Sequence, residues 1–378
     1  MAAHLKPQPA DARHDPDVVA VDRVEVSAFK IPTDAPESDG TLEWDSTTLV
    51  LVEISAGGKT GLGYTYGHHA IGTLIRDKLA AIVAGRNAMD IGDAWLAMLK
   101  ALRNLGRYGI APMAVAAVDI ALWDIKARLL DLPLVTLLGA YHAGVPVYGS
   151  GGFTSYTDDM LAEQLRGWVD AGIGRVKMKI GREPDRDPAR MRAARDAIGD
   201  GVELFVDANG AYDRKQALAI AEHFVELGVH WYEEPVSSDD LEGLRLVRDR
   251  LPVVTELAAG EYGYGPADFR RLLAAGAVDV LQADITRCAG VTGFLEAAAL
   301  ANAYKVPLSA HCAPALHLHP CCAIKPLRHL EYFHDHVRIE RMLFDGTQDP
   351  IDGVLKPDLS RPGLGLELKR ADAEKFRI

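Results

Sequence analysis

The sequence predicts an α/β protein in which a parallel barrel of alternating strands and helices follows a smaller α+β region. Two observations favour this class. Eight short apolar runs follow residue 144, and each gap between them holds one helical pattern, as in a parallel barrel. Before residue 144, strand patterns come first and helical patterns second. The 378 residues, 48% of them hydrophobic, are enough for more than one domain.

The first region opens after a short polar segment. Residues 1–17 are rich in Pro, Asp and Ala and hold no apolar stretch of a secretory signal, so we expect a disordered tail. Strand patterns follow at 18–31, 46–56 and 61–67, and the turn residues "AGGKTG" predict a hairpin between the last two. We expect residues 32–45 to form a polar loop that exposes Trp44. Helical patterns occupy 71–85, 91–106 and 111–130.

The eight apolar runs of the second region are regularly spaced. They begin near residues 145, 175, 203, 230, 252, 278, 306 and 329, at intervals of 22 to 30 residues. A strand followed by a helix, repeated in this way, predicts a parallel barrel over residues 144–344. Residues 345–378 are loop-like, with three prolines, and are expected to return to the first region.

Ionisable residues follow the predicted strands at one end. Parallel barrels carry their catalytic groups at the carboxyl ends of the strands, whereas strand interiors rarely hold charge. Seven of the eight runs end in an ionisable group. These residues are Lys177 and Lys179, Asp207, Glu233, Glu261, Asp284, His311 and Glu331.

Three carboxylates come from consecutive strands and predict a metal site. Asp207, Glu233 and Glu261 would repel one another at neighbouring positions on the rim. A hard divalent cation relieves this repulsion, and oxygen ligands suit Mg²⁺. In "EEP", Glu233 and Glu234 point to opposite faces of the strand; we favour Glu233 as the inward residue, although alternation alone leaves both open.

Two further groups have the chemistry of acid–base catalysts. Lys177 and Lys179 project from the same face of the second strand, so each is expected to lower the pKa of the other and to favour a general base. His311 ends the seventh strand, and Asp284 at the end of the sixth can orient its ring. Because the second and seventh strands lie across the barrel, Lys179 and His311 would approach a substrate from opposite sides.

Composition excludes several classes of function. The formal net charge of −12 argues against nucleic acid or an anionic membrane as the main partner. No apolar run reaches the length of a membrane span. The four cysteines lack metal-finger spacing, and adjacent Cys321 and Cys322 do not suit a disulfide framework, which favours a reducing, cytoplasmic setting.

Taken in order, these motifs resemble one known family. The chain is similar to the enolase superfamily in its mandelate racemase-like subgroup, the acid-sugar dehydratase and racemase type. The resemblance runs from about residue 18 to the C-terminus, with roughly one motif per strand. The motifs are "KMK" (177–179), "VDANG" (206–210), "WYEEP" (231–235), "AAGE" (258–261), "QAD" (282–284), "SAH" (309–311) and "HLEYF" (329–333).

The resemblance implies a fold and a set of roles. The fold would be a modified TIM barrel of the (β/α)7β type, with an α+β capping domain at 18–143 that the segment 345–378 packs on and completes. Mg²⁺ would be held by the three carboxylates named above, and Lys179 and His311, the latter paired with Asp284, would be the two bases. Lys177 would bind the substrate carboxylate, Glu331 would hydrogen-bond it as the enediolate forms, and Asn209 would line the site. A homo-oligomer, either a dimer or an octamer, is usual for the family.

Specificity in this family lies in the capping domain, here in residues 32–45 and 64–69. The first segment carries five acidic residues and no base, which disfavours a second carboxylate nearby and suits a neutral polyol tail. Trp44, Tyr66, His68 and His69 are candidates to contact substrate hydroxyls.

The resemblance implies abstraction of the proton next to the carboxylate of a small-molecule acid. We expect loss of water to follow, which makes the protein a dehydratase of an aldonate or aldarate that yields a 2-keto-3-deoxy acid. A racemase or epimerase of a 2-hydroxy acid is the main alternative. A cycloisomerase and a non-catalytic protein that binds metal or sugar acids are further alternatives.

Overall fold

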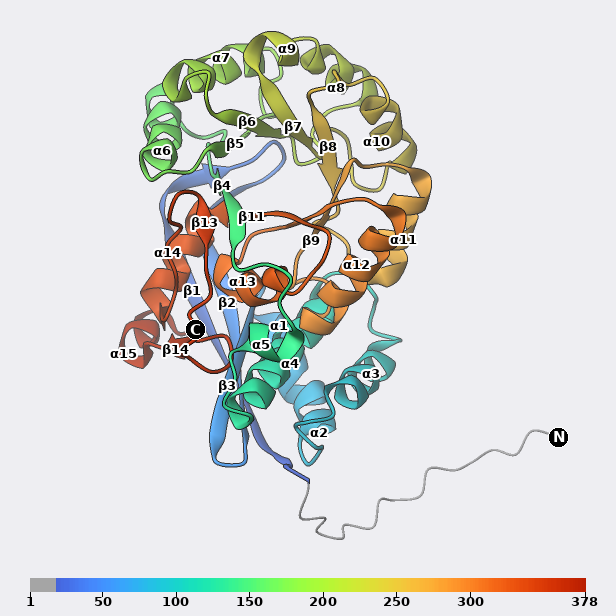
Figure 1. The fold of residues 1–378 in the computed structure, drawn as a ribbon, viewed down its shortest axis with the longest axis vertical. Helices are drawn as coiled ribbons and strands as arrows, with labels where there is room; N and C mark the ends of the chain where they lie inside the picture. Colours follow the sequence, from blue (N-terminus) through green and yellow to red (C-terminus); the bar gives the residue numbers. More distant parts are fainter. Residues whose placement is uncertain (1–17) are drawn as a thin grey trace, which may run out of the picture.

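The computed structural model describes residues 18–378, so the tail expected at 1–17 lies outside the described residues. Figure 1 shows a barrel with its helices around it, and an antiparallel sheet and helices from the first part of the chain beside it. The predicted fold class, a parallel barrel with an α+β capping domain, is confirmed.

The capping region is built on a three-stranded antiparallel sheet in the order β1-β2-β3. Its strands are β1 (Val21–Ser38), β2 (Glu43–Ala56) and β3 (Lys59–Tyr66). Ala56 pairs with Lys59, so Gly57 and Gly58 form a two-residue turn, both with positive φ. The hairpin predicted from the turn residues is therefore present.

The prediction of a polar loop at residues 32–45 is wrong for most of these residues, which belong to two strands. β1 runs to Ser38 and β2 begins at Glu43, so only residues 39–42 form the tip of a long hairpin, with a register shift between Pro32 and Glu37. Trp44 is partly buried, because its Nε1 donates to Glu37 Oε2 at 2.7 Å and its ring packs edge-on against Phe153 of the barrel. The local polar pattern predicted an exposed loop because it does not show that Trp44 packs against a distant part of the chain.

Helices follow the sheet along the chain, and α1, η1, α2 and α4 contact its strands. They are α1 (Ala70–Leu74), the π-helix η1 (Ile75–Leu79), α2 (Ala80–Val83), α3 (Ile91–Leu102), α4 (Ile110–Leu129) and α5 (Leu134–Leu138). The largely buried α4 lies directly on β3. A Cβ on Gly63 would come within 2.4 Å of the Ala117 carbonyl oxygen, so only glycine permits this close approach.

Eight parallel strands form the barrel, and pairing of β11 with β4 closes it. They are β4 (Val145–Ser150), β5 (Arg175–Lys179), β6 (Glu203–Asp207), β7 (Val229–Glu233), β8 (Glu256–Ala259), β9 (Val280–Ala283), β10 (Leu308–Ala310) and β11 (Leu327–Phe333). The intervening and following helices are α6 (Asp158–Asp170), α7 (Asp187–Ile198), α8 (Arg214–Ala221), α9 (Phe224–Leu227), α10 (Leu241–Arg248), α11 (Pro266–Ala275), α12 (Gly290–Tyr304), α13 (Pro314–Cys322) and α14 (His334–Leu343).

The two faces of β5 have different surroundings. Val176 and Met178 belong to the large apolar core, whereas the alternating Lys177 and Lys179 contact carboxylates of other barrel strands. A separate buried cluster, formed by Tyr148, Phe205, Trp231, Ala258 and Val280, comes from β4, β6, β7, β8 and β9. The Tyr148 ring lies 5.5 Å from Lys177 Nζ, so this apolar cluster supports the charged end of the barrel from one side.

The last segment returns to the capping region (Figure 1). It contains β12 (Phe344–Asp345), β13 (Val354–Leu355), β14 (Glu367–Leu368), α15 (Arg370–Ala373) and the 3₁₀-helix η2 (Glu374–Phe376). Ile378 N donates to the Ala28 carbonyl at 3.0 Å, and Leu364 N donates to Asp124 Oδ1 at 2.7 Å. Among residues 18–378, none of the helices has the length and apolar character needed to cross a membrane.

Candidate active site

Three buried carboxylates meet at the carboxyl ends of β6, β7 and β8. Asp207 ends β6 and pairs in register with Glu233 at the end of β7, while Glu261 follows β8 by two residues. One oxygen of each lies within 4.8 Å of the other two. The structure therefore brings together the three residues that the sequence selected, with Glu233 rather than Glu234 in the group.

Both lysines of β5 point at these carboxylates. Lys177 Nζ lies 2.6 Å from Glu233 Oε1, 2.8 Å from Glu331 Oε1 and 3.2 Å from Asp207 Oδ2. Lys179 Nζ lies 2.5 Å from Asp207 Oδ2. The buried lysine ammonium groups therefore alternate with buried carboxylates, and the attraction between them offsets part of the free-energy cost of removing these charges from water.

The predicted lowering of a lysine pKa is wrong for this arrangement. Burial opposes the charge on Lys179, and so does Lys177, but the carboxylates of Asp207, Glu233 and Glu331 together outweigh both, so the pKa of Lys179 is raised. The pKa of Lys177 is also raised, because Glu233 and Glu331 outweigh its burial. The carboxylates on neighbouring strands, which alternation along a single strand does not reveal, outweigh the repulsion between the two lysines.

The Asp284 carboxylate holds His311 through the ring nitrogen Nδ1. Its Nδ1 lies 2.8 Å from Asp284 Oδ2, while Asp284 Oδ1 accepts from the backbone N and the Oγ1 of Thr286, both at 2.7 Å. Burial opposes a charged ring, but Cys312, Glu261, Glu331 and the hydrogen bond to Asp284 favour it, and the pKa of His311 is raised. The predicted His–Asp pairing is thus present, with Asp284 itself fixed in position.

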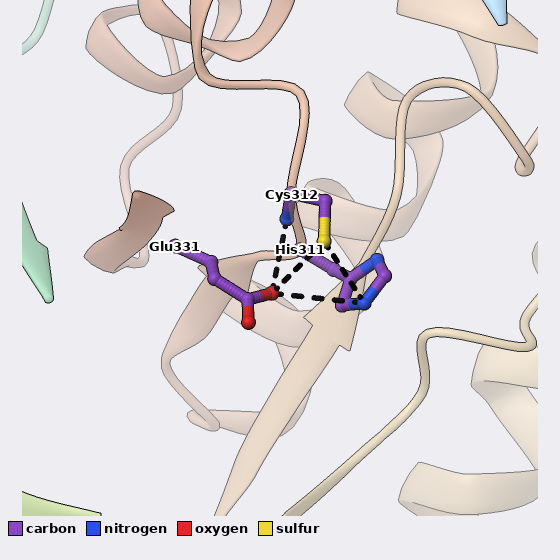
Figure 2. A group of neighbouring side chains, drawn as sticks. All are labelled: His311, Cys312 and Glu331. Atoms are coloured by element: carbon purple, nitrogen blue, oxygen red, sulfur yellow. Dashed lines mark hydrogen bonds and ion pairs between the residues drawn. The ribbon is translucent and has the colours of Figure 1, made fainter. Parts of the chain in front are cut away.

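The other nitrogen of His311 faces the centre of the site. Its Nε2 lies 3.1 Å from Glu261 Oε2. It also lies 3.6 Å from Glu331 Oε2 and 3.3 Å from Cys312 Sγ (Figure 2). Glu331 is held by Ser150, whose Oγ donates to Oε1 at 2.6 Å, and by the backbone N of Cys312, which donates to Oε2 at 3.1 Å.

A cavity of about 620 Å³ opens beside the carboxylate cluster. Asn209, Glu234 and Tyr262 line it, together with Tyr108 from the capping region. Asn209 follows Asp207 in a left-handed conformation, φ 47°, and its buried Oδ1 has no hydrogen-bond partner in the described structure. Lys179 and His311 do not line this cavity. Glu234 does line it, and its pKa is raised, first by burial and then by the nearby carboxylates of Glu261, Asp207 and Glu233.

The capping residues differ in their relation to this site. The tip of the β1–β2 hairpin lies on the barrel rim, since a Cβ on Gly40 would come within 2.6 Å of the Ala208 carbonyl oxygen. Tyr66 is buried and stacks on His336 with ring centres 3.5 Å apart, so its ring is covered. His68 and His69 are exposed and pack on each other, and the described structure gives neither a hydrogen bond to a barrel residue.

Two residues near the site, Arg287 and Cys312, were missed from the sequence. Arg287 lies 3.0 Å from Glu261 Oε1 through Nη1 and stacks over Tyr262 at 5.0 Å. The sequence did contain a signal for Arg287, because it follows Asp284 by three residues, a spacing that can bring its side chain back to the same rim of the barrel. Cys312 directly follows His311, and its Sγ lies 3.3 Å from the Nε2 of that ring. Glu234, which alternation had left open beside Glu233, lines the cavity instead of joining the three-carboxylate group.

Comparison with known proteins agrees with this geometry. Residues 24–139 match the N-terminal domain of mandelate racemase / muconate lactonizing enzyme, and residues 160–373 match the "Enolase C-terminal domain-like" family. The chain belongs to the mandelate racemase and muconate lactonizing enzyme group of the enolase superfamily.

Relatives of this superfamily member act on sugar acids. The 3,6-anhydro-alpha-L-galactonate cycloisomerase of Streptomyces coelicolor is 32% identical over 363 residues, 92% of this chain and 97% of that protein. The L-talarate/galactarate dehydratase of Salmonella typhimurium is 32% identical over 342 residues, 86% of this chain and 85% of that protein. Dehydratases named for arabinonate, gluconate, rhamnonate and galactonate are also similar.

Solved structures share the whole architecture. A mandelate racemase/muconate lactonizing enzyme-like protein from Rubrobacter xylanophilus is 58% identical, with a TM-score of 0.93 over 95% of this chain and 100% of that one. An L-talarate dehydratase from Polaromonas sp. JS666, complexed with Mg and L-glucarate, is 31% identical, with a TM-score of 0.85 over 95% of this chain and 97% of that one. These relatives support an enzyme.

Proposed function

We propose that this protein is a Mg²⁺-dependent dehydratase of a sugar acid, an aldonate or aldarate, that forms a 2-keto-3-deoxy acid. The observation that carries the proposal is the placement of Lys179 on β5 and His311 after β10, on different sides of a buried three-carboxylate cluster. A carboxylate substrate bound between them would present its α-carbon to a base on each side.

The donor set fits the metal. Asp207, Glu233 and Glu261 would hold Mg²⁺, since they offer buried carboxylate oxygens within 4.8 Å of one another and no soft ligand among the three. When bound, the ion supplies Lewis-acid stabilisation of the negative charge on the substrate carboxylate. The similar dehydratase that holds Mg and L-glucarate supports this assignment.

The chain's own residues would divide the remaining work. Lys177 offers a buried ammonium to the substrate carboxylate, and Glu331, held by Ser150, would hydrogen-bond that carboxylate as its enediolate forms. Once deprotonated, Lys179 Nζ or His311 Nε2 would take the α-proton, and the electron pair of that C–H bond would form the C=C bond of the enediolate. As the β-hydroxyl leaves, this pair would move to form the double bond between the α- and β-carbons. The β-hydroxyl leaves as water after accepting a proton from the opposite group, and the enol becomes the 2-keto-3-deoxy acid.

Asn209 and the capping hairpin would recognise the rest of the substrate. The unpartnered Oδ1 of Asn209 lines the cavity and can accept from a hydroxyl. Trp44 lies on the hairpin that covers the rim, while Tyr66 and His68 remain candidates from the sequence. A dimer or octamer remains our expectation for the assembly.

The test is a screen of aldonates and aldarates with the purified protein and Mg²⁺, in which 2-keto products are detected as semicarbazones. We expect at least one acid to yield a 2-keto product. If no acid yields this product while one exchanges its α-proton for deuterium, dehydration is excluded and racemisation or epimerisation is favoured.

A cycloisomerase is the second candidate because the Streptomyces coelicolor relative, 32% identical over most of the chain, is one. The same screen should therefore include anhydro-sugar acids and sugar-acid lactones. Conversion of one of these without release of water would favour the cycloisomerase over the dehydratase.

A further inference from the structure

Three donor atoms of different kinds meet on one side of the catalytic rim. They are Nε2 of His311, Sγ of Cys312 and Oε2 of Glu331, all from buried residues (Figure 2). The sulfur lies 3.3 Å from the nitrogen and 3.4 Å from the oxygen, and the nitrogen lies 3.6 Å from the oxygen. The proposed reaction uses the nitrogen and the carboxylate but gives no task to the thiol.

These separations match the edges of a tetrahedral metal site. Zinc binds thiolate sulfur at about 2.3 Å, imidazole nitrogen at about 2.0–2.1 Å and carboxylate oxygen at about 2.0–2.2 Å. Tetrahedral angles then place the three donor atoms about 3.3–3.6 Å apart. The observed triangle therefore needs little rearrangement to accept an ion at its centre.

Each donor is also held in place by other contacts. Asp284 binds the Nδ1 of His311, so Nε2, which also lies 3.1 Å from Glu261 Oε2, is the nitrogen presented to a metal, in the arrangement that zinc-binding histidines use. Cys312 has φ 53° and is followed by Ala313 with φ 40°, so two consecutive non-glycine residues adopt the left-handed region where the thiol is presented. Glu331 Oε2 accepts from the Cys312 backbone N at 3.1 Å.

We propose that His311, Cys312 and Glu331 form a second cation site, for a thiophilic divalent metal such as Zn²⁺, and that its occupation inhibits the enzyme. On binding, the S–H bond of Cys312 breaks and a protonated His311 loses its Nε2–H proton, both protons go to solvent, and sulfur–metal and nitrogen–metal bonds form. The ion takes the Nε2 lone pair of His311, which can then no longer accept a proton. The inhibition rests on the proposed function, whereas the binding does not.

The two cation sites differ in chemistry although they are neighbours. Asp207, Glu233 and Glu261 supply oxygen alone, which suits Mg²⁺, whereas thiolate and imidazole favour zinc, cobalt or cadmium. Glu331 joins the two regions, because its Oε1 lies 2.8 Å from Lys177 Nζ and its Oε2 faces the thiol. Excess Mg²⁺ should therefore not displace a thiophilic ion from the second site.

Cobalt is the direct probe, because a thiolate–Co²⁺ bond gives a charge-transfer band in the near ultraviolet. We expect Co²⁺, added to the protein in saturating Mg²⁺, to produce this band with one equivalent bound. Cys312→Ala and Cys312→Ser should abolish it, whereas Cys321→Ala, which removes another buried free thiol, should keep it. Asp284→Asn should weaken Co²⁺ binding about 10–100-fold, since it removes the partner of a ligating histidine.

Absence of the band in the wild-type protein, or its persistence in both Cys312 variants, would overturn the site. The inhibition is measured separately, as α-proton exchange of a substrate acid with and without Zn²⁺ in saturating Mg²⁺. We expect Zn²⁺ to suppress the exchange that depends on His311 at least tenfold in the wild-type protein and to have no effect in Cys312→Ala. Equal inhibition of both proteins would refute this role, and failure of every acid to exchange would count against the proposed function without affecting the cobalt result.

Discussion

Asp284 shows how one side chain at the rim fixes another. One oxygen accepts from Thr286 through both its backbone N and hydroxyl, and the other binds Nδ1 of His311. The pKa of Asp284 is lowered, since hydrogen bonding and the charge of His311 outweigh burial. An ionised carboxylate here selects the His311 tautomer whose Nε2 is free to accept a proton.

We expect Asp284→Asn to reduce the α-proton exchange that depends on His311 by about 10²–10⁴-fold, because the amide favours the wrong tautomer of the ring. Exchange that depends on Lys179 should fall much less, and it serves as the control within the same variant. NMR of each α-configuration of the substrate in D₂O measures both rates. An equal loss for the two configurations would show that Asp284 has a general structural role instead.

At the scale of elements, the β1–β2 hairpin connects the capping region to the barrel. Ser38 and Thr154 share a hydrogen bond of 2.6 Å between their hydroxyls, and Thr154 N donates to the Ser38 carbonyl at 2.9 Å. The tip at Gly40 rests on carbonyl oxygens that follow β5 and β6, the strands that carry Lys179 and Asp207. The position of the tip therefore controls how the catalytic rim is covered.

We expect Gly40→Ala to raise KM and lower kcat/KM at least tenfold, because the added methyl would lie 2.6 Å from the Ala208 carbonyl oxygen and displace the tip. Gly167→Ala in α6 is the matched control, since a Cβ there meets no atom within 4 Å. That variant should keep full activity and gain about 0.5–1 kcal/mol of stability. Steady-state kinetics of both variants checks the claim, which fails if Gly40→Ala is fully active.

The same hairpin carries a buried carboxyl with a pH-dependent effect on stability. Burial, with help from Asp335, raises the pKa of Glu37 from 4.5 to about 8. The folded chain therefore keeps a proton that the unfolded chain loses, so this contribution to stability is complete below pH 4.5 and disappears as the pH rises through about 8.

Relative to Glu37→Gln, the wild-type protein should lose up to about 1.4 kcal/mol of stability per pH unit across that interval. Calorimetric Tm values of both proteins at several pH values between 5 and 9 measure the difference. A constant difference in Tm over this range would contradict the raised pKa of Glu37.

Sequence reasoning succeeded where a repeating pattern determines position. The strand–helix repeat gave the barrel, and the end of each strand gave Lys179, Asp207 and His311 at one rim, because parallel strands share that end. It failed where contacts join distant segments. Trp44 was assigned to an exposed loop because its packing partner, Phe153, lies far away in the sequence, on the barrel. The contact of Arg287 with Glu261 depends on how two barrel loops turn, which the strand–helix repeat does not specify.

For the whole molecule, the barrel holds one charged centre at its rim, the tip of the β1–β2 hairpin lies on that rim, and the C-terminal segment packs on the capping region. The carboxylates of Asp207, Glu233, Glu261 and Glu331 and the two lysines of β5 are buried there, and in this structure the lysines provide much of the counter-charge. A bound cation that stabilises the folded state, but not the unfolded one, should raise the stability of the entire assembly.

Mg²⁺ at 100 times its Kd should stabilise the protein by about 2.7 kcal/mol, seen as a higher Tm, and EDTA should abolish both this gain and the activity. Glu261→Gln should reduce the Mg²⁺ response. Glu340→Gln should retain it, because that buried carboxyl binds Tyr64 and the Ala315 N, away from the cluster. Activity that survives EDTA would exclude the metal assignment.

The central claim is that two bases, one from each side of the barrel, remove the proton next to a substrate carboxylate. The most direct measurement is α-proton exchange in D₂O, followed by NMR, for both α-configurations of a sugar acid with the wild-type protein, Lys179→Ala and His311→Asn. We predict that Lys179→Ala loses exchange from one configuration and His311→Asn from the other, each by about 10²–10⁴-fold. Full exchange of both configurations in both variants would contradict the account.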